Sequence, residues 1–359
     1  MKLVSVNKLK PGQVVAENIY TTDDRLIVPR GTVLKESDIE RIKAFSLYNI
    51  FVDEAKRNEQ KTKSPAEKLS YSERIKNTEE FVRFRQHIEE NAEKLEESFR
   101  LIANGSIPLD VDKLTEPVYH LFVEAGGTAG IFDMLHNLRD NSDAVYMHSL
   151  NVSLISNTLA TWMRLPSEMI YIATAAGLLH DIGKVFIPNE ILNKTSPLTE
   201  SENRILRGHV VKGYELVRDK DIDDHIKKTI LMHHELRDGS GYPLHLRAGQ
   251  IDEISAIVTV ANVYDFLTTS KSYRGPICPF AVIGWFEEDG LQKYDTNVIM
   301  TFLSNIVNTF IANRVVLSDG KRGDIIFVNP DHLSKPVVKC GNTFIDLYKS
   351  NGLYIKEVV

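Results

Sequence analysis

Two adjacent pairs of side chains in this sequence have the residue types that bind metal ions. His180 precedes Asp181 at the end of the apolar run 170–179, and His233 is followed directly by His234. A buried imidazole–carboxylate pair costs free energy unless something compensates for it, and a metal ion does so effectively. The two pairs therefore indicate a metal centre.

Such pairs need a special backbone. Adjacent side chains on a helix point about 100° apart, so neighbours converge on one point only near a helix end or bend. We predict that Gly183 provides the bend after His180 and Asp181. Gly239 and Gly241 permit a second tight turn further along the chain.

Six positions could meet in the core of a helical bundle, because each lies in or beside an amphipathic helical stretch: His148, His180, Asp181, His209, His233 and His234. Any single buried histidine is more often a hydrogen-bonded core residue than a ligand. Five histidines and one aspartate together favour the metal centre. The remaining histidines have no such context and receive no role: His87, His120, His136, His225, His245 and His332.

The ligand types limit the chemistry. Imidazole and carboxylate without thiolate suit iron, manganese or zinc, and argue against a structural zinc site of the cysteine type. The two oxygens of Asp181 could bridge two ions. A two-metal centre is suited to phosphodiester hydrolysis, because the ions activate water and stabilise the leaving oxygen.

Four motifs in a fixed order resemble the HD-GYP family of HD-superfamily metal-dependent phosphohydrolases. They are HDIGK at 180–184, HHE at 233–235, DGSGYP at 238–243 and VYDFLTTSKSYR at 263–274. The resemblance covers roughly residues 143–313. It implies a cyclic-di-GMP phosphodiesterase that opens the cyclic dinucleotide to pGpG and possibly on to GMP. The six positions above would be its metal ligands. The cofactor would be two divalent ions, iron or manganese first, with zinc, magnesium, nickel or cobalt as further options.

One position departs from the family pattern. Asn262 stands where the family has a ligand aspartate, and its amide offers a carbonyl oxygen without charge. We expect one metal site to be weakened. The alternative function is a degenerate HD-GYP protein that binds a cyclic dinucleotide or a protein and signals with little or no hydrolysis. Ala144 replaces a glutamate associated with a third metal, so two ions are expected at most, with Asp143 a weak substitute.

Substrate-binding residues are implied by the same resemblance. Lys184 lies one helical turn from Asp181, so it is assigned to catalysis and phosphate binding, while Lys271 and Arg274 share one face of a helix or turn. The alternative for each cation is a solvated surface charge. Tyr242 is expected to stack on or hydrogen-bond to substrate, or else only to pack the loop. The loop around it is also the candidate contact for a signalling partner.

The N-terminal half should supply two further segments. Residues 1–54 indicate a small α/β domain for regulation or interaction, with a hairpin of strands 14–16 and 26–28, a helix from Ser37 and a strand at 48–52. Residues 55–142 indicate a charged linker, a long amphipathic helix over 70–104 and two short helices. Four apolar residues of the long helix recur every seven positions, which fits a coiled-coil homodimer or packing on the chain's own core: Phe81, Ile88, Leu95 and Ile102.

The C-terminal half positions the chemistry. Residues 143–313 read as an all-α bundle that carries the HD-GYP motifs, and residues 314–359 as a short antiparallel β extension with Asp-Gly, Asn-Pro and Asn-Gly turns. The predicted fold class is mainly α: an HD-type bundle between a small α/β domain and a β extension.

Composition excludes several classes of protein. A formal charge of −6 over 359 residues argues against a nucleic-acid partner, which usually needs a basic face. Two cysteines, Cys278 and Cys340, are too few for a disulfide framework and suggest a reducing compartment. The start of the chain lacks a signal-peptide pattern, and the longest apolar run is about half a membrane span. We expect a cytoplasmic protein without a membrane segment.

Overall fold

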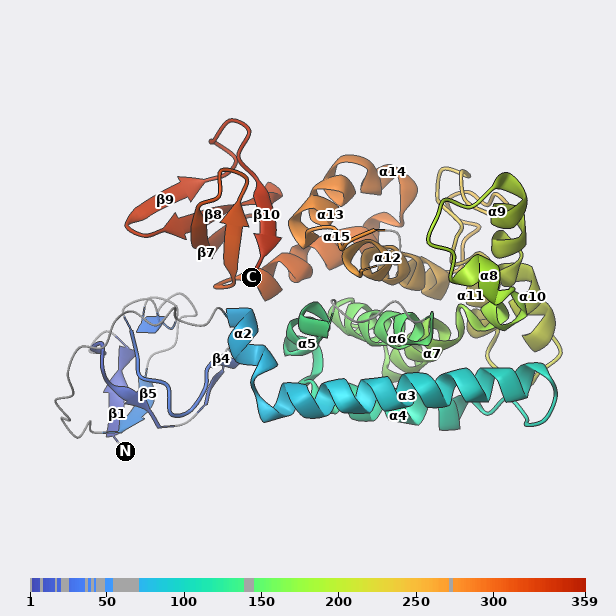
Figure 1. Cartoon of the computed structure of the whole chain (residues 1–359), viewed down its shortest axis with the longest axis horizontal. Coiled ribbons are helices and arrows are strands. Elements are labelled where there is room, and N and C mark those ends of the chain that lie inside the picture. Colours follow the sequence, from blue (N-terminus) through green and yellow to red (C-terminus); the bar gives the residue numbers. More distant parts are fainter. Residues whose placement is uncertain are drawn as a thin grey trace. The chain divides into compact units, whose positions relative to one another are not determined.

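The computed structural model describes residues 2–6, 9–16, 18–20, 26–35, 38–39, 42, 49–53, 71–138, 145–270 and 274–359. The chain divides into two compact units, residues 1–71 and 72–359 (Figure 1). Each unit has a hydrophobic core of its own.

The first unit contains two small antiparallel sheets. Three strands have the order β1-β5-β2, and a separate pair joins β3 to β4. The bounds are β1 Lys2–Ser5, β2 Val14–Val15, β3 Ile19–Tyr20, β4 Leu26–Val28 and β5 Asn49–Asp53. The predicted strand at 48–52 is confirmed as β5, which forms the centre of the larger sheet.

The predicted hairpin of this unit is wrong. Strand β4 pairs with β3, whereas β2 pairs with β5. A strand of two residues such as β3 carries too little alternation to be seen in a sequence. Of the predicted helix, residues 38–39 and 42 are helical, and Ile42 is fully buried. Its start at Ser37 and the linker expected after residue 54 lie outside the described residues.

The second unit is mainly helical, which confirms the predicted fold class. Its α-helices are α2 Tyr71–Lys76, α3 Glu79–Ala103, α4 Val111–Glu124, α5 Ile131–Leu138, α6 Val145–Trp162, α7 Ser167–Leu179, α8 Asn189–Leu192, α9 Glu200–Arg207, α10 His209–Val217, α11 Asp224–Met232, α12 Glu253–Thr268, α13 Pro279–Trp285, α14 Leu291–Lys293 and α15 Thr296–Ile306. Short 3-10 or π turns link some of them: η2 Gly127–Ala129, η3 Ile182–Phe186, η4 Phe286–Gly290 and η5 Val307–Phe310.

The predicted helix over 70–104 is interrupted. It forms α2 and α3, and Thr78 caps α3 by accepting a hydrogen bond from the backbone N–H of Phe81 at 3.1 Å. All four residues of the seven-residue pattern, from Phe81 to Ile102, are buried in the chain's own core. The homodimer stays a prediction, and these four residues already pack against other residues of the same chain.

Three helices form the centre of the unit. Helix α6 packs against α7 and α12, and α3 covers α6 from outside (Figure 1). Residues from Met147 to Ala160 of α6 are buried on every face. Polar groups in such a helix must find partners inside, and Ser153 Oγ donates to the carbonyl of Thr174 at 2.6 Å.

An apolar window over Ser167–Phe186 has the length and composition of a membrane span, but 67% of it is buried inside the structure. Core helices of soluble proteins pass the same test. The window includes α7, which packs against α6 and α12.

The chain ends in a five-stranded antiparallel sheet of order β10-β6-β7-β8-β9. Its strands are β6 Arg314–Leu317, β7 Arg322–Asn329, β8 His332–Cys340, β9 Thr343–Asp346 and β10 Ile355–Val358. The β extension is confirmed, although β9 was not predicted. The carboxylate of Glu287 accepts the backbone N–H groups of Leu333 and Ser334 at 2.6 and 3.0 Å, which ties the sheet to the helices.

Candidate metal centre

Five helices deliver the predicted ligands to one place. Most ligands stand at a helix end, where the backbone can aim a side chain inward. His148 is in the first turns of α6, His180 and Asp181 follow α7, His209 begins α10, His233 and His234 follow α11, and Asn262 lies within α12.

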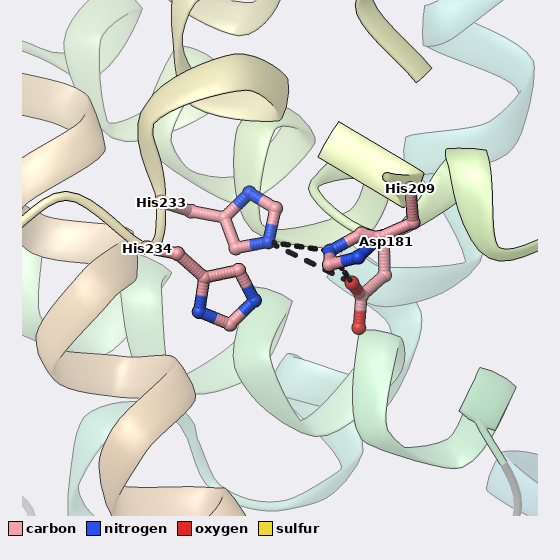
Figure 2. Close-up of side chains that lie close together, drawn as sticks. All are labelled: Asp181, His209, His233 and His234. Atoms are coloured by element: carbon pink, nitrogen blue, oxygen red, sulfur yellow. Dashed lines mark hydrogen bonds and ion pairs between the residues drawn. The ribbon is translucent and has the colours of Figure 1, made fainter. Parts of the chain in front are cut away.

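These residues form two clusters that share Asp181. One joins Asp181 to His209, His233 and His234, and the other joins it to His148 and His180. Within each cluster one possible ligand atom per residue lies within 4.8 Å of the others. Figure 2 shows the first cluster, with the three imidazole rings gathered around the carboxylate.

The two carboxylate oxygens of Asp181 face different clusters. Oδ1 lies 3.2 Å from Nε2 of His209 and 3.7 Å from Nε2 of His233. Oδ2 lies 3.1 Å from Nε2 of His180 and 3.8 Å from Nε2 of His148. This is the arrangement that a carboxylate bridging two ions requires.

The buried polar atoms fit divalent ions. His180 Nε2 and Asp181 Oδ1 are buried and have no hydrogen-bond partner within the described part of the chain, which is costly unless an ion satisfies them. The Nδ1 atoms of His180, His209 and His233 each donate to a backbone carbonyl, at 2.7, 2.7 and 3.0 Å. These bonds hold the proton on Nδ1 and leave the Nε2 lone pair facing the centre.

Electrostatics keeps the ligands in their binding forms. Burial raises the pKa of Asp181, but the interactions of its carboxylate with His180 and with the Lys184 ammonium outweigh burial and hold that pKa well below its usual range. Burial, assisted by the neighbouring imidazoles, lowers the pKa values of His233 and His234 well below the ordinary value. An ionised carboxylate and neutral imidazoles are the states that bind metal.

Helix α12 supplies a residue that the sequence analysis left without a role. Asp265 Oδ2 accepts from His148 Nδ1 at 2.6 Å, and its Oδ1 accepts from the Asn151 amide at 3.0 Å. A carboxylate behind a ligand histidine orients the ring and makes it a stronger ligand. Asn262 Oδ1 lies 2.9 Å from His148 Nε2, on the side of the ring that faces the cluster with His180 and Asp181. The signal for Asp265 was its spacing of three from Asn262, which gives one helix face.

The prediction for Gly183 needs correction. Helix α7 ends before His180, and Gly183 lies in η3, packed against the start of α10. A Cβ atom there would lie 2.0 Å from the His209 carbonyl oxygen and 2.6 Å from the Gly213 nitrogen. Close approach of two backbones, rather than a bend, requires glycine at this position.

The predicted substrate residues occupy different surroundings. Lys184 Nζ lies 2.6 Å from Asp181 Oδ2, beside the centre as predicted. The Arg274 guanidinium donates to the carbonyls of Phe266 and Leu267 at 2.9 and 3.0 Å, so it caps the C-terminus of α12. Its phosphate contact stays a prediction that would require these bonds to rearrange. Lys271 lies outside the described residues.

The loop after α11 is attached to the ligands. The Tyr242 ring stacks on His234 with centroids 4.6 Å apart and planes 16° apart. The buried carboxylate of Glu235 accepts the backbone N–H groups of Leu244 and Leu246 at 2.5 and 2.9 Å. Gly239 has a φ of +83°, which favours glycine. The loop is thereby fixed against the metal centre.

Comparison with known proteins finds one family model that matches the region of the two clusters. The family described as "HD domain" matches residues 134–298. The matched region contains all the residues of both clusters, in agreement with the resemblance predicted from the motifs.

The relatives of this chain are named after cyclic dinucleotides. "Cyclic di-GMP phosphodiesterase PA4108" of Pseudomonas aeruginosa is 30% identical over 57% of this chain and 50% of its own length. "3'3'-cGAMP-specific phosphodiesterase 1" of Vibrio cholerae is 35% identical over 37% of this chain and 31% of its own. The solved structure of Bd1817, an HDG"Y"P protein from Bdellovibrio bacteriovorus, covers 86% of this chain and 99% of its own, with TM-score 0.44 and 18% identity. The chain spans about half the length of the first of these relatives.

Proposed function

We propose that the chain is a metal-dependent phosphodiesterase that hydrolyses cyclic-di-GMP to pGpG and, in a second step, to GMP. One observation carries this proposal: the carboxylate of Asp181 is shared between two clusters of imidazoles. Two divalent ions bound there supply electrophilic activation of the phosphate and of water. The identification of the substrate rests on the relatives named above.

The residues of this chain have defined tasks in that reaction. The imidazoles of the two clusters would hold the ions in a buried site, and Asp181 would contribute one oxygen to each cluster. Lys184 lies against Asp181 and is placed to meet a phosphate oxygen. Its ammonium then stabilises the negative charge that develops on the phosphate. Iron and manganese are the ions proposed first, because both accept imidazole and carboxylate.

Asn262 supports the second candidate, a binding module with weak or no hydrolysis. Its amide faces His148 but brings no charge to the cluster of His148, His180 and Asp181. That cluster therefore has one carboxylate, shared with the other ion. If the second ion is weakly bound, the protein would bind substrate but hydrolyse it slowly.

One experiment distinguishes the hydrolase from the binding module. The purified chain is loaded with manganese or iron(II), given cyclic-di-GMP, and assayed for pGpG and GMP by chromatography. The hydrolase gives pGpG, and the double change His180→Ala, Asp181→Ala abolishes it. Binding without product, and no product after Asn262→Asp, would favour the binding module.

We also propose a cytoplasmic location and a signalling partner at the loop after α11. The location is supported by the small number of cysteines and by the nature of the proposed substrate. The loop exposes 51% of Leu244 although Glu235 fixes its backbone. An exposed apolar side chain on a rigid loop suits a protein contact.

A further inference from the structure

We propose that Arg207 is a substrate-binding residue that holds the second phosphate of the cyclic dinucleotide, the one that is not being cleaved. This inference rests on the proposed function and adds a specificity-determining residue to it. Arg207 is the last residue of α9, two positions before His209. The same junction of two helices therefore places both a ligand and this cation.

The guanidinium is held at the edge of the metal centre by one aromatic ring. Arg207 Cζ lies 4.8 Å from the centroid of Tyr242, and Tyr242 stacks on His234. A cation over a tyrosine ring is attracted by the ring's quadrupole. The Tyr242 ring thus lies in contact with both Arg207 and His234, a residue of the cluster with three histidines.

The charge of Arg207 has no partner among the described residues. No carboxylate from that part of the chain lies within ion-pair distance, and the side chain is exposed. The Tyr242 phenol likewise has no hydrogen-bond partner among them. An unpaired cation and a free O–H beside a centre that binds an anion form a second anion-binding position.

The chemistry of the substrate calls for such a position. A cyclic dinucleotide carries two phosphodiesters on one small ring. The ions and Lys184 engage the reacting phosphate, so the other one needs a donor outside the centre. Arginine matches two phosphate oxygens with its planar fork, whereas lysine offers only a point charge.

The test compares Arg207→Gln with Arg207→Lys, and uses Arg204→Gln as the control, because Arg204 is an exposed arginine on the same helix. KM and kcat are measured with cyclic-di-GMP and with bis(p-nitrophenyl) phosphate, which has only the reacting phosphodiester. Binding of cyclic-di-GMP is measured by calorimetry alongside.

Arg207→Gln is expected to raise KM for cyclic-di-GMP about tenfold, the effect of one lost charged hydrogen bond, with little change in kcat. Both constants for bis(p-nitrophenyl) phosphate should stay as in the wild type, Arg207→Lys should lie between, and Arg204→Gln should have no effect. An equal loss with 3'3'-cGAMP, in which adenine replaces one guanine, supports a phosphate contact.

Three results would overturn the assignment: no change in KM, an equal loss with both phosphodiesters, or a loss that is smaller with 3'3'-cGAMP. Wild-type protein that binds cyclic-di-GMP without cleaving it would refute the hydrolysis, and the dissociation constants would still decide on Arg207. Wild-type protein that binds none would refute both.

Discussion

At the scale of single residues, the carboxylate shared by the two clusters sets what the centre could hold. Asp181 is buried, ionised and in contact with imidazoles on both sides. The two clusters differ in their other donors. One has three histidines, and the other has two histidines and the neutral amide of Asn262. The second position should therefore be the weaker one.

Asn262→Asp should strengthen that weaker position. The added carboxylate faces His148, so the second ion should bind at least about tenfold more tightly, the size of effect that donors around a metal commonly have. Calorimetric titration of metal-free protein with manganese measures both affinities. Asn305→Asp, on helix α15, which carries none of the residues of the two clusters, is the control. Unchanged affinity for the second ion would show that Asn262 does not face an ion.

The histidine pKa values predict how metal-free protein responds to acid. His233 and His234 have pKa values below those of the unfolded chain, so the unfolded state binds more protons below about pH 6.5. Above that pH the neutral histidines cause no loss of stability. Below it, the free energy of unfolding should fall by up to about 1.4 kcal/mol per pH unit for each histidine. Urea unfolding between pH 7 and 5 measures this slope.

The double change His233→Asn, His234→Asn should flatten the slope. The control is His120→Asn, at an exposed side chain. Equal slopes in all three proteins would mean that the two ligand histidines protonate freely in the folded state.

At the scale of the elements, the contact between η3 and α10 aligns two halves of the centre. Gly183→Ala would put a methyl group 2.0 Å from the His209 carbonyl oxygen. We expect a loss of about 3 kcal/mol or more, at the upper end of overpacking effects, together with weaker metal binding. Gly275→Ala is the matched control, since its added methyl group meets nothing within 4 Å. Equal melting temperatures for the two variants would contradict this packing.

The loop after α11 depends on one buried carboxylate. Glu235→Gln replaces an acceptor oxygen by an amide that cannot accept from both Leu244 and Leu246, which should cost about 1–3 kcal/mol. Hydrogen exchange at these two amides should speed up while exchange in α6 stays slow. The exposed Glu288→Gln on η4 provides the comparison. Unchanged exchange at Leu244 and Leu246 would show that Glu235 does not hold the loop.

At the scale of the whole molecule, the features that could be predicted from the sequence are those marked by long periodic patterns or by several motifs in order. Long amphipathic stretches predicted the bundle, and an ordered series of motifs pointed to residues that the structure gathers around Asp181, including His148 and His209 from separate helices. Short strands such as Ile19–Tyr20 have no readable periodicity, so their pairing was missed. Asp265 received no role although it shares a helix face with Asn262, because its contact with His148 joins residues far apart in the sequence, as does the contact of Arg207 with Tyr242.

Metal content and position test the central claim most directly. Crystals of the chain loaded with excess manganese would be examined by anomalous scattering, with the metal-to-protein ratio measured on the same sample. Two ions per chain, joined by the two oxygens of Asp181 and separated by about 3.5–4 Å, are the predicted result. One ion alone, or a second ion away from His148 and His180, would contradict a shared two-metal centre.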